Sequence, residues 1–284
     1  MSDFHAGDEI GGYRIVRCLG KGGMGAVFEV EHLRLGTHYA LKTFTFEADD
    51  AGVMKRRFLT EGKALARLSD RHIVRVFDLD YDEATGTPYF VMDLVLDRDG
   101  NPHTLADVSA GNFDEACLVR WFEDLAQALD YIHSRGIVHR DIKLGNVLLG
   151  ADGHVVLSDF GVSRFANSDL AQEIDAVRTS FSTRSKLRMI VGTSGFMAPE
   201  VRRGRAATAA ADVYSLGVMF VYLLTGMWHV CGSKALQLLD GFDYAWGEIL
   251  PQLLDEDPAG RATDLVPLAW RLCASKNADE GEVS

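Results

Sequence analysis

Hydrophobic and polar residues alternate in short runs along the first third of the chain. The runs that predict β-strands lie at residues 13–19, 27–30, 39–42, 73–77 and 88–92. A period of two residues places alternate side chains on opposite faces of a half-buried strand. The glycine-rich run at 20–25 separates the first two strands and has the composition of a turn. We therefore expect the chain to begin with a set of neighbouring strands.

Helical spacing of apolar residues replaces this alternation farther along the chain. Between the third and fourth predicted strands, Met54, Phe58, Leu65 and Leu68 form a stripe that predicts one helix. The strongest helical segment is 113–135, whose stripe consists of Leu118, Trp121, Phe122, Leu125, Leu129 and Ile132. Residues 212–224 and 262–273 predict two further helices. The second part of the chain is therefore expected to be mainly helical.

Two short apolar runs, 147–149 and 155–157, flank a glycine-containing turn and predict a hairpin. This hairpin would return Asp159 to the side of Asn146. A carboxylate and an amide oxygen placed side by side form a hard-oxygen site for Mg²⁺, which usually binds together with nucleotide phosphates. The spacing therefore predicts a metal site at the base of the hairpin.

Charged residues near the predicted metal site have the types that phosphoryl transfer needs. Asp141 is placed to accept the proton of an incoming hydroxyl, and Lys143 offers positive charge to the transferring group. His139 is better interpreted as a buried structural residue than as the base. Lys42 lies in an otherwise apolar strand, where a buried ammonium needs a partner, and Glu61 in the following helix is the candidate.

Composition excludes several classes of protein. The 284 residues are 47% hydrophobic, enough for a full core, and the net charge of −12 argues against nucleic acid or an anionic membrane surface as the main ligand. No signal peptide is visible at the N-terminus, and the longest apolar run is too short to cross a bilayer. The cysteines, Cys18, Cys117, Cys231 and Cys273, show no pairing pattern, which predicts free thiols and a cytoplasmic location.

Residues 139–146 and 159–161 resemble the catalytic loop and metal-binding loop of eukaryotic-like (Hanks-type) protein kinases, most closely the bacterial Ser/Thr branch. The resemblance implies an α+β, bilobal protein-kinase fold, with a small antiparallel β N-lobe that carries one key helix and a mainly α-helical C-lobe. It places the kinase domain at about 11–274, with the N-lobe at 11–93, the hinge at 93–96 and the C-lobe at 97–274. Residues 275–284 are expected to form a flexible acidic tail.

The resemblance also implies ATP and Mg²⁺, with Mn²⁺ as an alternative metal. Taken alone, the glycine pattern is equally compatible with an ordinary β-turn; in the family it covers the phosphates. The expected nucleotide-binding residues are Leu19, Gly20, Lys21, Gly22, Gly23, Met24, Gly25, Val27, Ala40, Lys42, Met92, Asp93, Val95 and Leu148. The expected metal ligands are Asn146 and Asp159, and the expected catalytic residues are Asp141, Lys143, Lys42 and Glu61.

Residues 159–200 match the activation segment of the family and are long for it. A mobile, solvated loop is the plain interpretation, and an autophosphorylation cluster is the sharper one. Arg140 matches the residue that pairs with a phosphate on this segment, and the register suggests Thr183 or Ser185 as the acceptor. Thr193 matches the turn against which Ser/Thr kinases dock their substrates.

Several structural roles follow from the same resemblance. Asp212 is expected to accept backbone amide bonds from the catalytic loop, and Arg261 is expected to pair with Glu200. Leu144 stands where the family usually has proline, and the lower part of the C-lobe is short. The polar segment 97–111 is longer than a hinge exit requires and has no counterpart in the resemblance.

The predicted function is therefore transfer of the γ-phosphoryl group of ATP to Ser or Thr hydroxyls of proteins. A transient homodimer would serve autophosphorylation between two copies, and neither nucleic acid nor a membrane is an expected partner. Two alternatives stay open: a pseudokinase that acts as a nucleotide-binding scaffold, and a small-molecule phosphotransferase. The first usually lacks Lys42, Asp141 or Asp159, and the second lacks the motif at 198–200, so these residues favour the kinase.

Overall fold

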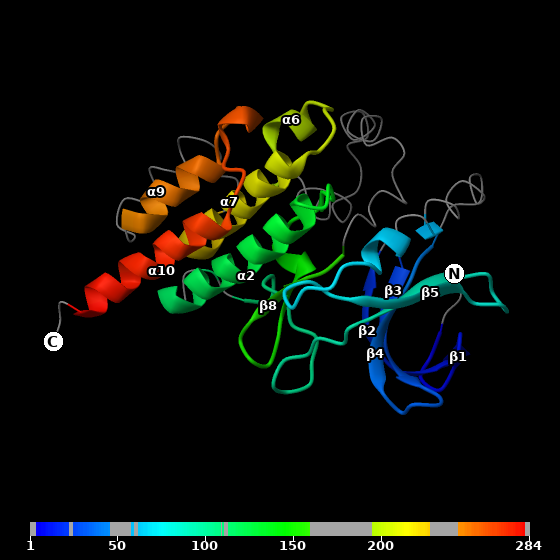
Figure 1. Ribbon diagram of the computed structural model, residues 1–284. Coiled ribbons are helices and arrows are strands. Elements are labelled where there is room, and N and C mark those ends of the chain that lie inside the picture. The colour runs from blue at the N-terminus through cyan, green and yellow to red at the C-terminus, as the bar shows by residue number, and fades with distance from the viewer. Residues whose placement is uncertain are drawn as a thin grey trace.

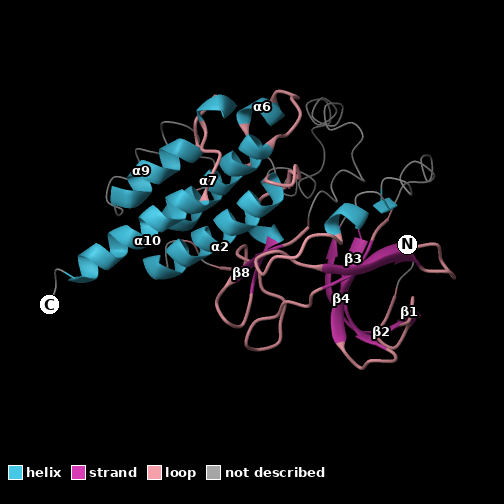
Figure 2. Cartoon of the chain, in the orientation of Figure 1, coloured by secondary structure: helices cyan, strands magenta, loops and turns pink. Residues whose placement is uncertain are grey.

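Six antiparallel strands form one sheet at the N-terminal end of the computed structural model (Figures 1 and 2). In spatial order they are β1 (Glu9–Ile10), β2 (Tyr13–Gly22), β3 (Gly25–His32), β4 (His38–Thr43), β6 (Pro88–Met92) and β5 (Val76–Tyr81). The structure describes residues 4–22, 25–45, 58–59, 62–108, 110, 113–159, 195–227 and 244–281, and from 275 onward only the backbone. The predicted set of neighbouring strands is confirmed.

The two faces of the sheet carry different apolar clusters because side chains alternate along each strand. Leu41 of β4 and Val91 of β6 point into one cluster with the residues of β1, β2 and β3. Phe90 points to the opposite face, where its ring stacks on that of Phe58 with the centroids 4.6 Å apart. Phe58 lies in a short helical stretch of which residues 58–59 and 62–65 are described. The helix predicted from Phe58 and Leu65 thus covers this face.

One predicted strand is displaced. The strand expected at 73–77 begins only at Val76, and Ile73 instead bridges Leu157 of the hairpin. Val74 donates its backbone N–H to the carbonyl of Leu157 at 2.9 Å. The apolar side chains of Ile73 and Val74 are buried against the second lobe, so these residues link the lobes instead of extending the sheet.

Helices dominate the second lobe. They are α2 (Glu115–His133), α6 (Pro199–Arg202), α7 (Ala209–Thr225), α9 (Tyr244–Leu253) and α10 (Val266–Gly281), with short 3₁₀ turns η2 (Leu144–Asn146) and η3 (Pro258–Gly260). The small antiparallel hairpin β7 (Val147–Leu149) and β8 (Val155–Leu157) lies beside α2 (Figure 1). None of the helices in the described part of the chain is both long and apolar enough to cross a bilayer.

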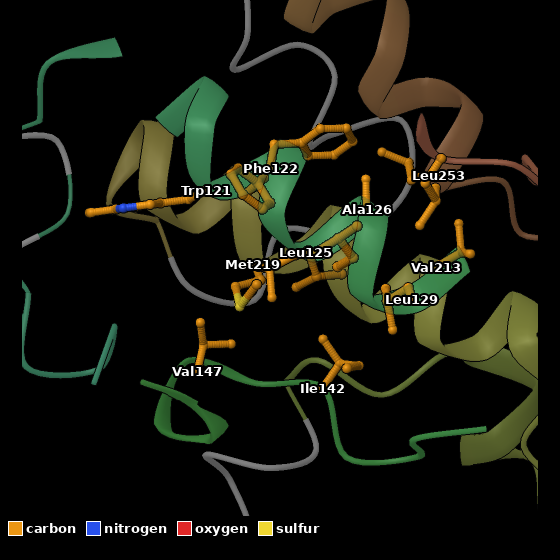
Figure 3. Close-up of a cluster of buried hydrophobic side chains, with 14 of the residues drawn as sticks. Trp121, Phe122, Leu125, Ala126, Leu129, Ile142, Val147, Val213, Met219 and Leu253 are labelled. Carbon is orange, nitrogen blue, oxygen red and sulfur yellow. The ribbon is translucent and has the colours of Figure 1, made fainter. Parts of the chain in front are cut away.

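The core of this lobe forms between α2, α7 and α9. Figure 3 shows Trp121, Phe122, Leu125, Ala126 and Leu129 of α2 among the side chains of the neighbouring elements. Below them, Ile142 of the catalytic loop and Val147 of β7 belong to the same cluster. The loop that carries the predicted base is therefore attached to the core through its apolar residues.

Two predictions about the C-terminal part need correction. The closing helix expected at 262–273 begins at Val266, because the backbone nitrogens of Leu265 and Val266 bind the carboxylate of Asp130 at 2.9 Å. The helix then continues to Gly281, through residues expected to form a flexible tail. Neither glycine nor proline interrupts the run between Ala274 and Glu280, and Ala, Lys and Glu favour a helix.

A buried carboxylate joins three elements behind the hairpin. Asp124 of α2 accepts hydrogen bonds from the backbone nitrogen of Val155 and lies 3.0 Å from Nδ1 of His154. His72, before β5, approaches Asp124 with its own Nδ1 at 3.4 Å. Arg71 donates to Nε2 of His72, so the His72 proton sits on Nδ1 and faces the carboxylate. Hydrogen bonds within this group therefore connect α2, β8 and the loop before β5.

The cysteines that the structure describes are Cys18, Cys117 and Cys273, and all are free thiols as predicted. Burial raises the pKa of the Cys273 thiol, and so does the nearby carboxylate of Glu123. Cys231 lies outside the described residues.

Candidate active site

The catalytic loop at 139–146 is attached to the start of α7 by one carboxylate. Asp212 is almost fully buried and accepts hydrogen bonds from the backbone nitrogens of His139 and Arg140, both at 2.7 Å. His133, at the end of α2, places its Nε2 3.0 Å from the same side chain. Arg140 has a positive φ of 71°, a conformation that is costly for a residue other than glycine. The hydrogen bonds to Asp212 offset the cost of this backbone conformation. They agree with the predicted role of Asp212, which is to accept backbone amide bonds from the catalytic loop.

His139 is fully buried and has a defined tautomer. Its Nε2 lies 2.9 Å from the backbone carbonyl of Ser158 and must donate to it, because a carbonyl oxygen only accepts. Its Nδ1 then accepts from the backbone nitrogen of Asp141 at 3.3 Å. Both ring nitrogens are occupied by structural bonds. His139 therefore supports the loop instead of acting as a base, in agreement with the sequence interpretation.

Asp141, Lys143 and Asn146 form a compact polar group. The Oδ2 atom of Asp141 lies 2.7 Å from Nζ of Lys143 and accepts from Nδ2 of Asn146 at 2.9 Å. Nδ2 of Asn146 also donates to the backbone carbonyl of Asp141 at 2.8 Å. These two bonds orient the amide, so that its oxygen points away from Asp141. The oxygen of Asn146 is thus the atom left to bind a cation.

The hairpin places Asp159 next to this group. Leu157 of β8 pairs with Val147 of β7, and Ser158 donates both its backbone N–H and its hydroxyl to the carbonyl of Asn146, at 2.8 and 2.9 Å. Asp159 follows at once and has a positive φ of 61°. The predicted metal ligand thus has a left-handed backbone conformation, which is costly for a residue other than glycine.

Lys42 meets Asp159 across the two lobes. Its Nζ lies 2.6 Å from Oδ1 of Asp159, and the Lys42 side chain is mostly buried. The sequence predicted that the buried ammonium would need a carboxylate, and here Asp159 supplies one. The predicted partner, Glu61, lies outside the described residues. The pair brings the ammonium of the sheet and the carboxylate of the metal-binding loop into direct contact.

Neighbouring strands place several of the predicted nucleotide-binding residues opposite one another. Ala40 of β4 pairs with Met92 of β6, and Val27 of β3 pairs with Lys42. Leu148 lies on β7 in the other lobe. The backbone of Asp93 is held by Arg75, whose carbonyl accepts from the Asp93 nitrogen at 3.0 Å. Leu19, Gly20, Lys21, Gly22 and Gly25 lie at the facing ends of β2 and β3, and Val95 lies within the expected hinge at 93–96.

Gly25 is required by close packing as well as by flexibility. It has a φ of 143°, and a Cβ atom at this position would lie 1.9 Å from the backbone oxygen of Thr43. Gly20, in contrast, has open space around it. Packing of the sheet therefore requires glycine at position 25, whereas the space around Gly20 is open to a ligand. Gly23 and Met24 lie outside the described residues.

A buried ion pair stabilises the C-lobe below the site. Arg261 donates to both carboxylate oxygens of Glu200, at 2.7 and 2.9 Å, as predicted. Burial alone raises the pKa of Glu200, but its hydrogen bonds to Arg261 outweigh that effect and hold the pKa below its ordinary value. The regulatory candidates Thr183, Ser185 and Thr193 lie outside the described residues.

Sequence reasoning missed the segment that follows the hinge. Leu105 donates its backbone N–H to the carbonyl of Val147, and Leu149 donates to the carbonyl of His103, each at 2.9 Å. Thr104 forms an antiparallel bridge with Leu148, so this segment lies along β7 like a third strand. The turn residues Gly100, Asn101 and Pro102 are the only sequence signal for it, and they do not indicate the pairing partner.

Comparison with known proteins identifies the family. The model of the protein kinase domain matches residues 13–243, which is most of the chain. This chain therefore belongs to the protein kinase family, and its α+β fold is the bilobal fold of that family. The N-terminal antiparallel sheet and the mainly helical second lobe agree with the architecture expected from the sequence.

Bacterial proteins are among the curated relatives of this chain. Serine/threonine-protein kinase PknD of Chlamydia caviae is 36% identical over 228 residues, which cover 75% of this chain and 24% of PknD. Pkn1 of Myxococcus xanthus is 34% identical, covering 78% of this chain and 30% of its own length. PknA of Mycobacterium tuberculosis is 33% identical, covering 80% and 49%. The chain thus spans between a quarter and half of the length of these relatives.

Solved structures show the same fold. The crystal structure of the Mycobacterium tuberculosis PknI kinase domain is similar with a TM-score of 0.69 and 26% identity, covering 97% of this chain and all of that one. A double mutant of the same kinase domain has a TM-score of 0.71 at 25% identity.

Proposed function

We propose that this chain is an active serine/threonine protein kinase that transfers the γ-phosphoryl group of ATP to protein hydroxyls. The observation that carries the proposal is the group of Asp141, Lys143 and Asn146 on a loop held by Asp212, with the Lys42–Asp159 pair beside it. The relatives named serine/threonine-protein kinases support the choice of hydroxyl acceptor. A pseudokinase does not transfer phosphate, so it would not need these catalytic groups to lie together in this arrangement.

The proposed roles follow from the chemistry of each group. Asp141 orients the acceptor hydroxyl and takes its proton as the oxygen attacks the γ-phosphorus, while the bond to the β-phosphate oxygen breaks. Lys143 donates to an oxygen of the transferring group and stabilises its charge. Lys42 binds the α- and β-phosphates, with Glu61 as its partner. Most of the rate enhancement would come from positioning and electrostatic stabilisation.

The donor set fits a hard divalent cation. The Asn146 amide is oriented by Asp141 with its oxygen turned outward, and Asp159 offers a carboxylate after the hairpin. Oxygen donors of this kind suit Mg²⁺, or Mn²⁺ in its place. When bound, the metal would neutralise phosphate charge. Asn146 and Asp159 would hold it, and Lys42 would bind the phosphates.

We further propose that the kinase domain extends to about residue 274, with the hinge at 93–96. The family model ends at 243, but α10 supports the longer boundary. Leu268 and Leu272 of α10 belong to the same buried cluster as α2 and α7. A cytoplasmic location remains a prediction from the free thiols.

For regulation we propose autophosphorylation at Thr183 or Ser185, between two transiently associated copies. Arg140 supports this because its backbone is fixed by Asp212, next to the proposed base Asp141. Its guanidinium could then bind a phosphate on the activation segment and order that segment near the site. Thr193 would join the same arrangement as part of the substrate-docking turn.

The test is mass spectrometry of the protein incubated with Mg²⁺ and ATP, in parallel with Asp141→Asn. Wild type should gain phosphate on Ser or Thr, and Asp141→Asn should gain none while keeping its fold, because the change is isosteric. Asp80→Asn is a matched control, since Asp80 is exposed on the edge strand β5, and it should behave as wild type. Transfer by Asp141→Asn at the wild-type rate would refute the assignment of the base.

The regulatory proposal needs a separate measurement. Thr183→Ala combined with Ser185→Ala should lower activity toward an added protein substrate and abolish activation on preincubation with ATP. Equal activity of the double variant and wild type would contradict it. Mixing Asp141→Asn with active protein tests transfer between copies, because the inactive variant should then become phosphorylated.

A further inference from the structure

The segment after the hinge contains a closed turn, residues 97–101, which we call the 97–101 turn. The carboxylate of Asp97 accepts from the backbone nitrogens of Asp99 at 2.9 Å and Asn101 at 2.8 Å. The Asp97 nitrogen donates to the carbonyl of Asn101 at 2.9 Å, and Gly100 takes a positive φ of 76°. The turn is therefore a fixed structure whose carbonyl groups have set directions.

The 97–101 turn is joined to the lobe below the nucleotide-binding residues. Directly after it, His103 and Leu105 pair with β7 on both sides of Leu148, one of the expected nucleotide-binding residues. Arg98 also donates to the backbone carbonyl of Ala151, in the turn between β7 and β8, at 3.0 Å. The 97–101 turn is therefore attached to the strand at the lower side of the proposed nucleotide site.

The same turn is joined to the sheet above the site by one arginine. Arg17 of β2 donates from Nη2 to the backbone carbonyl of Gly100. Its Nε donates to Glu29 of β3 at 2.6 Å, and His38 of β4 lies 2.7 Å from the other carboxylate oxygen of Glu29. The mostly buried Glu29 therefore holds the guanidinium in place. Arg17 lies two residues before Leu19, one of the expected nucleotide-binding residues, on the same strand.

We propose that Arg17 is a positioning residue for nucleotide binding. Through its hydrogen bond to Gly100, which we call the clip, it connects β2, the strand of Leu19, to the 97–101 turn and so to β7, the strand of Leu148. The inference rests on the proposed function of the site. The hinge connects the lobes through the chain itself, and the Arg17–Gly100 bond adds a further connection near it. A nucleotide held between Leu19 and Leu148 leaves more slowly when the two strands cannot separate on this side.

Nucleotide dissociation measures this effect directly. With a fluorescent ATP analogue and Mg²⁺ in stopped flow, Arg17→Ala should raise the dissociation rate about threefold to tenfold, the size expected for one partly exposed charge-assisted hydrogen bond. The KM for ATP should rise in proportion, while kcat at saturating ATP stays within about twofold. Arg17→Lys should resemble Arg17→Ala, because an ammonium lacks the two-sided geometry that reaches Glu29 and Gly100 together.

Arg14→Ala is the matched control. Arg14 lies on the same strand but points to Glu9 and Glu31, at 3.2 and 3.9 Å, and is half exposed. Its removal should leave the dissociation rate and the KM for ATP unchanged. If Arg14→Ala and Arg17→Ala changed the rate equally, general weakening of the sheet would explain both results, and the proposal would be overturned.

A double-mutant cycle separates the clip from local packing. Asp97→Ala opens the turn and displaces the Gly100 carbonyl without touching the Arg17–Glu29 pair. It should raise the dissociation rate as Arg17→Ala does, and the double variant should be no faster than either single variant. Effects that multiply would show that the two residues act independently, which would overturn the proposal.

Amide hydrogen exchange tests the clip in the absence of nucleotide, so that its failure is distinguishable from failure of the proposed function. The backbone N–H of Leu149 is protected by the carbonyl of His103, next to the turn. Arg17→Ala should accelerate exchange in the peptide that contains Leu149, and Arg14→Ala should not. Unchanged exchange in Arg17→Ala overturns the clip even if the wild type binds ATP. Absence of nucleotide binding by wild type refutes the proposed function alone.

Discussion

The backbone nitrogen of Arg140 donates a hydrogen bond of 2.7 Å to Oδ1 of Asp212, and Arg140 has a φ of 71°. A carboxylate at the start of α7 thus holds a costly backbone conformation directly beside the proposed base. Oδ2 of the same carboxylate accepts from His139, so both oxygens are used.

Asp212→Asn should therefore impair both the loop and the fold. An amide group offers only one accepting oxygen, so one buried backbone N–H loses its partner, at a cost of about 1–3 kcal/mol in the free energy of unfolding. Turnover should fall more than tenfold, because the base is no longer held in place. Urea unfolding and steady-state kinetics measure the two effects. Asp114→Asn, at the exposed N-cap of α2, is the control and should leave turnover unchanged.

Lys42→Met should lose activity with a smaller loss of nucleotide affinity. Methionine has a similar length but no charge, so the carboxylate of Asp159, 2.6 Å away in the wild type, loses its ammonium partner. In the proposed function, alignment of the phosphates depends on that charge, whereas apolar residues would bind the adenine. Phosphoryl transfer compared with binding of a fluorescent ATP analogue checks the prediction. If phosphoryl transfer and affinity for the analogue fell to the same extent, Lys42 would act mainly in ground-state binding of the nucleotide.

The Glu200–Arg261 pair should make stability depend on pH. Because the folded pKa of Glu200 lies below its unfolded value, the pair contributes fully above the unfolded pKa of about 4.5 and is lost as the pH falls through the lower folded pKa. Glu200→Gln should lose about 3–5 kcal/mol near neutral pH, because Arg261 stays buried without a counter-charge. Its stability should then fall less steeply than that of wild type below pH 4.5.

The comparison for this pair is the double variant Glu200→Leu with Arg261→Met. It removes both charges together, so it should cost less than either charge removed alone. Urea unfolding at several pH values measures all three proteins. A wild-type pH profile that Glu200→Gln reproduces would contradict a role for Glu200 in acid sensitivity.

Gly217→Ala should destabilise the C-lobe although alanine favours helices. A Cβ atom on Gly217 of α7 would lie 2.9 Å from Cβ of Leu253 and 3.0 Å from Cδ2 of Leu254. Overpacking at such a contact costs about 1–3 kcal/mol, which exceeds the gain of up to about 1 kcal/mol in helix propensity. Urea unfolding measures the difference.

Gly247→Ala is the matched control for this contact. Gly247 lies in α9 and has no atoms close to the position of a new Cβ. The same substitution should there increase the free energy of unfolding by up to about 1 kcal/mol. If both variants were stabilised, the α7–α9 contact would be looser than the structure indicates.

Short stretches of the sequence encode the local chemistry of this protein. The motif around Asp141 and Asn146, the hairpin that leads to Asp159 and the apolar stripe of α2 all depend on short-range spacing, which periodicity and turn residues encode directly. The need of Lys42 for a partner also followed, because an unpaired buried ammonium is unfavourable. The partner that the sequence predicted, Glu61, lies outside the described residues.

Contacts between groups that are distant in the sequence depend on the tertiary fold. The contact of Lys42 with Asp159, the displacement of β5 by the contacts of Ile73 with the hairpin, and the pairing of Leu105 with β7 join residues far apart in the sequence. The bond from Arg17 to the carbonyl of Gly100 is of the same kind, and its acceptor is a backbone atom that every residue carries. A sequence pattern marks side chains and local turns, whereas such contacts depend on how the two lobes come to lie against each other.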